Sequence, residues 1–221
     1  MVPFSFAGQE MRLVQGRALY WVEERALLLA DLHLEKGSHY VRFGQMIPPY
    51  DSRETLGRVA AAVRETDARR VFCLGDSFHD ATGHARLEPH AAGMLAALTR
   101  ALDWVWIAGN HDAGGMGETL TEAQVRGLAL RHEARAGDES PEISGHFHPR
   151  LTVSARGRRI ARACAVSTGT RMILPAFGAF TGGMDAAAPE ILAALQPARA
   201  IDALAQAGDR LVRYPLWRAA A

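Results

Sequence analysis

The chain has 221 residues, 48% of them hydrophobic, which suits one well-cored domain over residues 1–221 and leaves little room for two. Its 25 Lys and Arg residues nearly balance its 24 Asp and Glu residues, so the formal net charge of +1 excludes nucleic-acid binding through bulk charge alone. A local basic strip stays open, because a summed charge does not say where the charges lie.

The N-terminal residues lack a basic stretch followed by an apolar core, so we expect no signal peptide. No apolar run approaches the length of a membrane span. The two cysteines, Cys73 and Cys164, do not suggest a disulfide framework, and Cys73 lies in an apolar run typical of a core. We therefore expect a soluble cytoplasmic protein.

The first half of the chain alternates short apolar runs with amphipathic stretches. The runs 17–22 and 26–31 predict two strands with a turn between them. After them we expect a helix over 52–66 capped by Asp51 or Ser52, a strand at 70–76, a helix over 87–101 and a strand at 103–110. Strands that alternate with helices favour a parallel sheet with crossover helices.

The second half has shorter apolar runs separated by polar turns. We expect strands at 125–134, 141–146, 150–159, 160–167 and 171–178. The stretch 189–208 predicts one or two helices broken near Pro197, and 210–217 predicts a closing strand. The whole pattern favours an α/β fold in which mixed sheets are flanked by helices.

Polar side chains with metal-ligand chemistry gather at the ends of the predicted strands. Open α/β sheets build their sites in the loops that follow the carboxyl ends of strands. Five such loops carry these residues: Asp31 and His33; Asp76, His79 and Asp80; Asn110, His111 and Asp112; His132; and His146 and His148. One such Asp is more often a turn or helix cap, and one such His is more often a packed residue. All five in order indicate a metal site.

The ligand types narrow the choice of metal. Carboxylates, imidazoles and an amide, without a nearby cysteine, favour Mn, Fe or Zn in a mixed nitrogen and oxygen shell. The donors exceed the needs of one ion. Two ions about 3.5–4 Å apart form the recurring clamp for phosphate ester chemistry.

The motifs "DLH", "GDSFHD", "GNHD", His132 and "GHFH" together resemble those of the calcineurin-like metallophosphoesterases. The stretches "DLHLEKG", "PPYDSRETL", "CLGDSFHD" and "LPAFGAFTGG" are further similar to the bacterial ligase-associated DNA damage response endonucleases. The resemblance implies an αββα sandwich and a two-metal, manganese-dependent phosphodiesterase. It also implies a DNA substrate in repair, with a ligase, helicase or exonuclease as partners.

The resemblance also implies a role for each motif residue. Asp31, His33 and His148 would hold one ion, Asn110, His132 and His146 the other, and Asp76 would bridge the two. His111 would face the phosphate as a general acid or a stabiliser of charge, and Asp112 would hydrogen-bond the His111 ring.

Residues near the motifs are candidates for contacts with substrate. Lys36, Arg42, Arg86 and Arg150 could bind the phosphates that flank the scissile one, with a solvated surface charge as the alternative reading for each. His79 either faces substrate or is an ordinary loop histidine. Asp80 is expected to orient a neighbouring group of the site.

Three alternatives to a DNA phosphodiesterase follow from the same residues. The chain could act on a small nucleotide or a phosphoprotein, or could be a scaffold that does no chemistry. The complete ligand set and His111 speak against the scaffold. A zinc hydrolase of amides is disfavoured, since the chain lacks an HExxH helix.

Overall fold

The computed structural model describes residues 1–112, 118–155 and 157–220. The helices are α1 (Lys36–Val41), α2 (Asp51–Thr66), α3 (Gly83–Arg86), α4 (Pro89–Ala101) and α5 (Pro189–Ala194). The strands of the first half are β1 (Val2–Phe6), β2 (Gln9–Val14), β3 (Ala18–Trp21), β4 (Ala26–Leu29), β5 (Arg70–Leu74), β6 (Asp103–Ile107) and β7 (Thr119–Leu120). Those of the second half are β8 (Glu122–Val125), β9 (Leu128–Arg131), β10 (Glu142–Ser144), β11 (Arg150–Ala155), β12 (Arg158–Ala163), β13 (Ala165–Ser167), β14 (Arg171–Ile173), β15 (Ala200–Ala207) and β16 (Arg210–Arg218).

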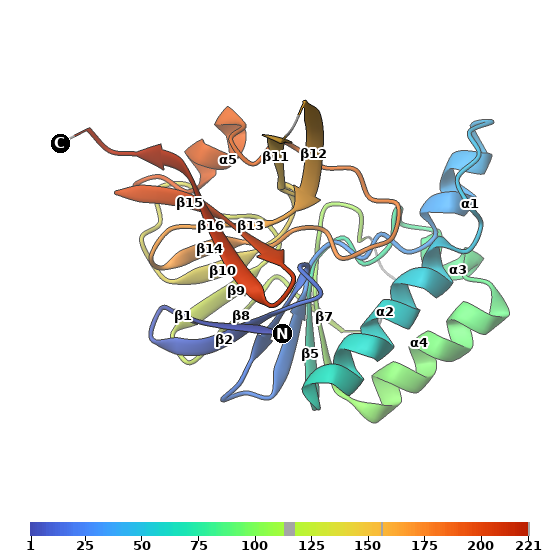
Figure 1. Ribbon diagram of the computed structural model, residues 1–221. Coiled ribbons are helices and arrows are strands. Elements are labelled where there is room, and N and C mark those ends of the chain that lie inside the picture. Colours follow the sequence, from blue (N-terminus) through green and yellow to red (C-terminus); the bar gives the residue numbers. More distant parts are fainter. Residues whose placement is uncertain (113–117, 156, 221) are drawn as a thin grey trace.

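The strands form two large mixed sheets and one separate hairpin (Figure 1). The first sheet has the order β1-β2-β3-β4-β5-β6-β7, and the second has the order β16-β15-β13-β14-β10-β9-β8. The antiparallel pair β11–β12 belongs to neither sheet.

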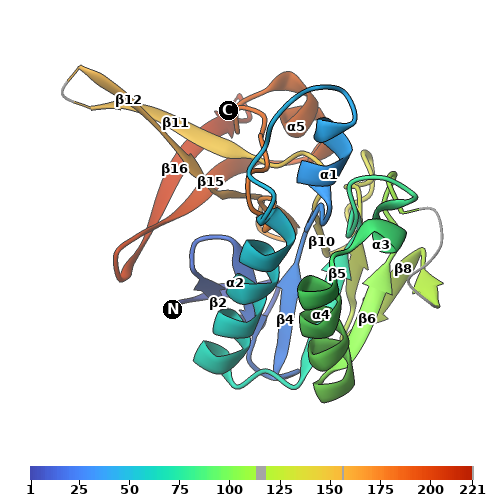
Figure 2. The same ribbon diagram turned by 90° about the vertical axis from the view of Figure 1, so that its right-hand side faces the viewer.

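Three apolar clusters divide the molecule into four layers. The middle cluster lies between the sheets and includes Trp21 and Phe72 of the first sheet and Leu130 and Met172 of the second. Helices α2 and α4 pack on the outer face of the first sheet, which Figure 2 shows from their side. Helix α5 packs on the outer face of the second sheet. The expected αββα arrangement of mixed sheets flanked by helices is confirmed.

The central strands of the first sheet place the motif loops together. Strands β4, β5 and β6 are parallel neighbours, as expected from their alternation with helices. Their carboxyl ends therefore meet at one edge, where the loops after β4 and β5 stay paired: His33 N donates to Asp76 O at 2.9 Å and Leu34 N to Ser77 O at 2.9 Å. Cys73 of β5 is buried, in agreement with its predicted core position.

The predicted helix over 189–208 is wrong in its second part. Helix α5 ends at Ala194, and residues 200–207 form strand β15 between β13 and β16. The segment is rich in alanine, which favours helix locally, but hydrogen bonds to two neighbouring strands outweigh that local preference. Strands β1 and β2 and helix α1 were not predicted, and the single strands expected at 125–134 and 160–167 are each divided in two.

Neither Asp51 nor Ser52 caps helix α2. Both lie inside its first turn, after Tyr50, and their side chains bind the segment that begins α1. Asp51 Oδ2 accepts from Gly37 N at 3.1 Å, and Ser52 Oγ accepts from Glu35 N at 2.9 Å. The two residues therefore hold the loop that follows the first motif against α2. Among the described residues, no helix is both long and apolar enough to span a membrane.

Candidate metal centre

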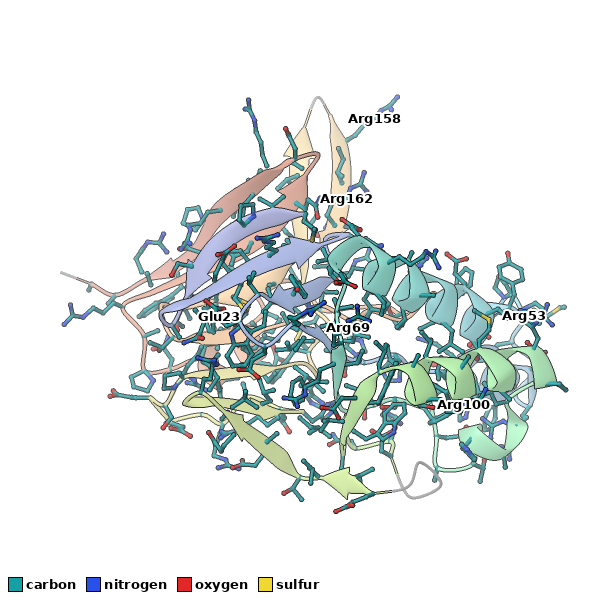
Figure 3. The ribbon with its side chains drawn as sticks, turned by 90° about the horizontal axis from the view of Figure 1, so that it is seen from below. Glu23, Arg53, Arg69, Arg100, Arg158 and Arg162 are labelled. Carbon is teal, nitrogen blue, oxygen red and sulfur yellow. The ribbon has the colours of Figure 1, made fainter. Side chains whose placement is uncertain are left out.

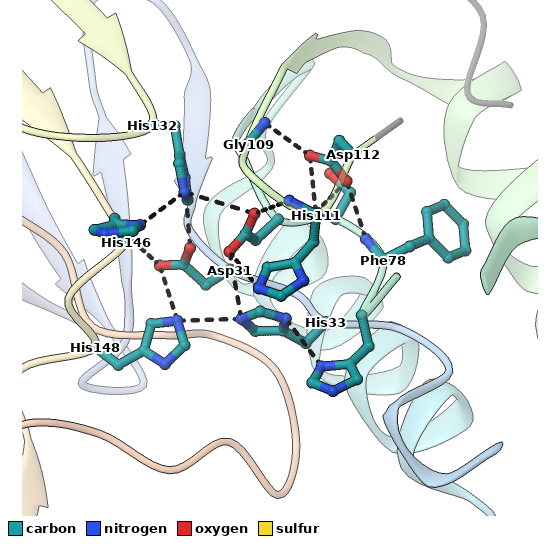
Figure 4. Close-up of polar contacts among 12 residues, drawn as sticks. Asp31, His33, Phe78, Gly109, His111, Asp112, His132, His146 and His148 are labelled. Atoms are coloured by element: carbon teal, nitrogen blue, oxygen red, sulfur yellow. Dashed lines mark hydrogen bonds and ion pairs between the residues drawn. The ribbon is translucent and has the colours of Figure 1, made fainter. Parts of the chain in front are cut away.

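The five motif loops converge at one edge of the two sheets (Figure 4). The loops after β4 and β5 come from the first sheet, and the loops after β9 and β10 come from the second. They form two groups of potential metal ligands: Asp31, His33 and His148, and Asp76, His132 and His146. Six of the seven predicted ligands are thereby placed side by side.

The first group combines Asp31 and two imidazoles that come from loops of both sheets. His33 Nε2 lies 3.2 Å from His148 Nε2, and His148 Nε2 lies 3.6 Å from Asp31 Oδ2. Burial, with the neighbouring His148 charge, lowers the pKa of His33 to about 2. His33 is therefore neutral, which is the form that binds a cation.

In the second group, a backbone carbonyl orients His132 from outside, and the Glu133 carboxylate lies near His146. His132 Nδ1 lies 3.1 Å from Leu74 O, and His132 Nε2 lies 3.5 Å from Asp76 Oδ1. His146 Nε2 lies 3.8 Å from the Glu133 carboxylate, while its Nδ1 lies 3.1 Å from His132 Nε2. A carbonyl or carboxylate behind an imidazole fixes which nitrogen faces the site. Glu133 was not predicted, although it directly follows His132 in the sequence.

Asp76 lies between the two groups. Its Oδ1 is 3.5 Å from His132 Nε2, and its Oδ2 is 3.8 Å from His33 Nε2. Each carboxylate oxygen therefore faces a different group. This is the arrangement that a bridging ligand requires.

The residues fit divalent cations on two observations. The buried Asp31 Oδ1 has no hydrogen-bond partner among the described residues, although buried carboxylate oxygens are normally paired. The imidazole nitrogens approach in pairs at 3.1 and 3.2 Å. Metal–nitrogen bonds of about 2.1 Å place neighbouring ligand atoms about 3 Å apart.

The backbone is strained at the predicted ligands themselves. Five predicted ligands have φ between 44° and 72°: Asp31, His33, Asp76, His146 and His148. Residues with a Cβ seldom adopt this left-handed conformation, and such strain is concentrated at functional sites. Glycines before the ligands allow close approach: a Cβ at Gly109 would overlap the Asp76 backbone N and Oδ1.

The loop after β6 carries two exposed predicted residues, Asn110 and His111. His111 N donates to Asp76 Oδ1 at 3.0 Å, and its ring Nε2 lies 3.8 Å from Asp76 Oδ2, with 46% of the side chain exposed. Asn110 is exposed beside it. No polar contact of the Asn110 side chain occurs within the described ranges, so its role as a ligand stays a prediction.

The predicted hydrogen bond between Asp112 and the His111 ring is not formed among the described residues, so this prediction is wrong. The Asp112 carboxylate instead accepts three backbone N–H groups, from Ser77 at 3.0 Å, Gly109 at 3.0 Å and Phe78 at 3.3 Å. Several converging amides satisfy a half-buried carboxylate better than one ring N–H. Asp112 therefore fastens the β6 loop to the Asp76 loop.

The partners of Asp80 lie beside the ligand groups, so its orienting role in the site stays a prediction. The Asp80 carboxylate binds the Arg86 guanidinium at 2.6 Å and His39 Nδ1 at 2.7 Å. Arg86 holds the pKa of Asp80 well below its usual range. Arg86 is thus engaged in an ion pair, which disfavours its predicted phosphate contact. His39, which was not predicted, lies in α1, six residues after His33.

His79 lies against the site. Its Nδ1 is 3.4 Å from His33 Nδ1, and its ring stacks on His111 with the centroids 5.7 Å apart. Burial and the Lys36 charge lower the pKa of His79 to about 4. The half-buried Lys36 extends over the Tyr40 ring, with Nζ 5.9 Å from the centroid.

The two other predicted substrate contacts lie at the edges of the site. Arg42 ends α1 with an exposed side chain. Arg150 begins β11, two residues after His148, and its aliphatic part packs on Gly183. The contacts of Arg42 and Arg150 with substrate stay predictions.

The chain is similar to known metal-dependent hydrolases. Residues 24–153, more than half of the chain, match the family model described as calcineurin-like phosphoesterase. A crystal structure of the Pseudomonas putida nuclease MPE is 30% identical, with a TM-score of 0.71, over 97% of this chain and 98% of that one. Yfce, a phosphoesterase from E. coli, is 14% identical with a TM-score of 0.44, over 85% of this chain and 96% of that one. No curated protein matches the chain.

Proposed function

The chain belongs to the calcineurin-like phosphoesterase family, and from this premise we propose that it is a dinuclear phosphodiesterase acting on DNA. Members of this family are metal-dependent hydrolases of phosphoric esters, and this chain is one of them. The similarity to a nuclease along nearly the whole chain supports DNA as the substrate. Single-stranded DNA or DNA ends, cleaved during repair in the cytoplasm, are the proposed targets.

The proposed metal ligands are the two groups that Asp76 joins. Asp31, His33 and His148 would hold one ion and Asn110, His132 and His146 the other, with Asp76 shared. Mn²⁺ is the proposed ion, with Fe and Zn as alternatives that the same donors admit. Bound divalent ions lower the pKa of water and neutralise the phosphate oxygens.

His111 carries the proposal for chemistry. Its ring stands over the shared carboxylate, with Nε2 3.8 Å from Asp76 Oδ2, and it is exposed where the ligand groups are mostly buried. A phosphate seated on the ligand groups would meet this ring from the solvent side. His111 is thus suited to protonate the leaving oxygen or to stabilise its developing charge.

The substrate side of the site is proposed from α1 and the Asp76 loop. Lys36 and His79 lie beside His33, and their positive or donor groups suit a phosphate next to the scissile one. The near-neutral chain favours short single-stranded stretches over extended duplex. A ligase, helicase or exonuclease of a repair set would be the partners.

The test is a metal screen on three substrates. The purified protein, stripped with a chelator and reloaded with Mn²⁺, Fe²⁺ or Zn²⁺, is given single-stranded DNA, bis(p-nitrophenyl) phosphate and p-nitrophenyl phosphate. We expect cleavage of both diesters with Mn²⁺, little turnover of the monoester, and no activity after chelation. Turnover of the small diester without DNA cleavage would contradict the nuclease, and metal binding without any turnover would favour a scaffold.

A further inference from the structure

A polar groove lies outside the candidate metal centre. It has a volume of about 400 Å³ and lies between three elements: the β2–β3 turn at 15–17, the β15–β16 turn at Gln206 and Gly208, and the base of the β11–β12 hairpin. Gly16 N donates to Gln206 Oε1 at 2.8 Å, which ties the two turns together. Arg17 and Arg162 line the groove, and its lining contains no carboxylate.

One lining residue of the groove, Arg17, contacts the segment that pairs with the strand before Asp31. Arg17 donates to Ala176 O at 2.6 Å, and Ala176 pairs with Ala30, the residue before Asp31. The charges of Arg58 and Arg150 lie near enough to lower the pKa of Arg17 further, beyond the larger effect of burial. Arg58 is paired with Glu54 at 3.0 Å, so Arg17 and Arg150 supply the positive charge on this side of the groove.

The hairpin continues this charge outward. Residues 150–163 contain no Asp or Glu, although acidic and basic residues balance over the whole chain. Arg158, Arg159 and Arg162 of β12 are exposed, and none of them forms an ion pair within the described parts of the chain. Figure 3 shows Arg158 near the outer end of the hairpin and Arg162 nearer its base.

The strand register places these arginines on two different faces of the hairpin. Side chains four residues apart in a strand share a face, so Arg158 and Arg162 lie on one face. Arg159 pairs with Ser154 and lies on the opposite face. Arg162 also lines the groove, and the register places Leu151, Val153 and Ile160 on the face of Arg158 and Arg162, so the two arginines flank an apolar strip next to the groove.

We propose that this groove and the Arg158–Arg162 face bind the sugar-phosphate backbone of single-stranded DNA as it leaves the metal centre. The inference rests on the proposed function, since it assigns a path to the same substrate. Arginines without carboxylate partners suit regularly spaced phosphates, and a polar groove without an aromatic lining contacts the backbone instead of the bases. The hairpin thus acts as a basic arm that holds the strand.

The test compares the double variant Arg158→Gln/Arg162→Gln with two controls. Arg159→Gln changes the opposite face of the same strand. Arg64→Gln/Arg100→Gln removes the same charge from exposed positions on α2 and α4. Binding of a 30-nucleotide oligothymidylate to chelator-treated protein is measured by fluorescence anisotropy over a range of salt concentrations.

We expect the double variant to bind the oligonucleotide about tenfold more weakly than the native protein. The slope of log affinity against log salt should fall by about 1.4, since each phosphate contact on a single strand contributes about 0.7. Both controls should stay within about twofold of the native protein. Turnover of bis(p-nitrophenyl) phosphate by the manganese-loaded double variant should be unchanged, because this ester is too small to reach the hairpin.

Each result separates the two proposals. Unchanged affinity and salt slope in the double variant, with DNA still cleaved, would overturn the basic arm and leave the nuclease standing. Binding that depends on Arg158 and Arg162 without cleavage of DNA would support the arm and overturn the nuclease. Absence of both binding and cleavage by the native protein would overturn both.

Discussion

The base of the metal centre and its open side are built in different ways. At the base, Asp31, Asp76 and His132 are buried, and backbone groups or other ligands hold them from several directions. On the open side, the His111 side chain is 46% exposed, and its ring lies 3.8 Å from the Asp76 carboxylate. The contrast matches the two proposed roles, because holding a cation requires fixed donors whereas protonating a leaving group requires access to substrate.

Removal of the shared carboxylate should give the largest effect. Asp76→Ala should lose both metal ions and all measurable turnover, because one side chain faces both ligand groups. Metal content by elemental analysis and turnover of bis(p-nitrophenyl) phosphate check this. Glu139→Ala, at an exposed carboxylate, is the control, and full metal content in Asp76→Ala would refute the bridging role.

Removal of the exposed imidazole should lower DNA turnover without affecting the metals. His111→Ala should lower kcat on single-stranded DNA by about 1000-fold, within the range of general acid–base catalysis. Loss on bis(p-nitrophenyl) phosphate should be much smaller if His111 is the acid, since nitrophenolate leaves without a proton. His90→Ala, on the exposed surface of α4, serves as the control. Loss of a metal ion in His111→Ala would mean that the open side also holds the cations.

A methyl group added to the β6 loop, at Gly109, should displace Asp76 at the base of the site. Gly109→Ala would press its Cβ on Asp76 N and Oδ1, and a displacement of about 1 Å in a catalytic geometry costs about 100-fold in rate. Steady-state kinetics and metal content measure the effect. Gly93→Ala has open space around its Cβ in α4 and should be neutral or stabilising. Equal activity in the two variants would show that the β6 loop can shift without moving Asp76.

Loss of the Asp112 carboxylate should weaken the attachment of the β6 loop and lower kcat only slightly. Asp112→Asn places amide hydrogens against the N–H donors of Ser77, Phe78 and Gly109, so the free energy of unfolding should fall by about 1–3 kcal/mol. Urea unfolding of the metal-free protein measures it, and kcat should fall by about tenfold or less. If the protein keeps its stability but loses as much kcat as His111→Ala, Asp112 orients the ring after all.

The smallest effect is expected beside the site, at the Asp80–Arg86 pair. Arg86 lowers the pKa of Asp80 in the folded protein, so the pair stabilises the fold above the unfolded pKa of about 3.9 and loses this effect as pH falls. Arg86→Gln should cost about 1 kcal/mol at pH 7. The difference from the native protein should shrink below about pH 4. Denaturation of metal-free protein at pH 7 and pH 3.5 tests this, and a difference that is constant with pH would assign the effect to packing.

The elements that carry the first three motifs follow from local sequence. The apolar runs before Asp31, Asp76 and Asn110 are local, continuous and separated by helical stretches, so parallel strands with their ends together follow from chain order. The predicted ligands Asp31, His33 and Asp76 are accordingly brought together, whereas His132, His146 and His148 join them only because the second sheet packs on the first.

Features that depend on partners distant in the chain became visible only in the folded structure. Residues 200–207 are a strand because β13 and β16 supply hydrogen bonds on both sides, although their alanines favour helix. Asp112 binds backbone amides 34 and 35 residues away, and Arg86 binds Asp80 in place of a phosphate. Local composition determines which backbone conformation is low in free energy. The partner of an exposed or half-buried polar group, in contrast, is known only when the chain has folded.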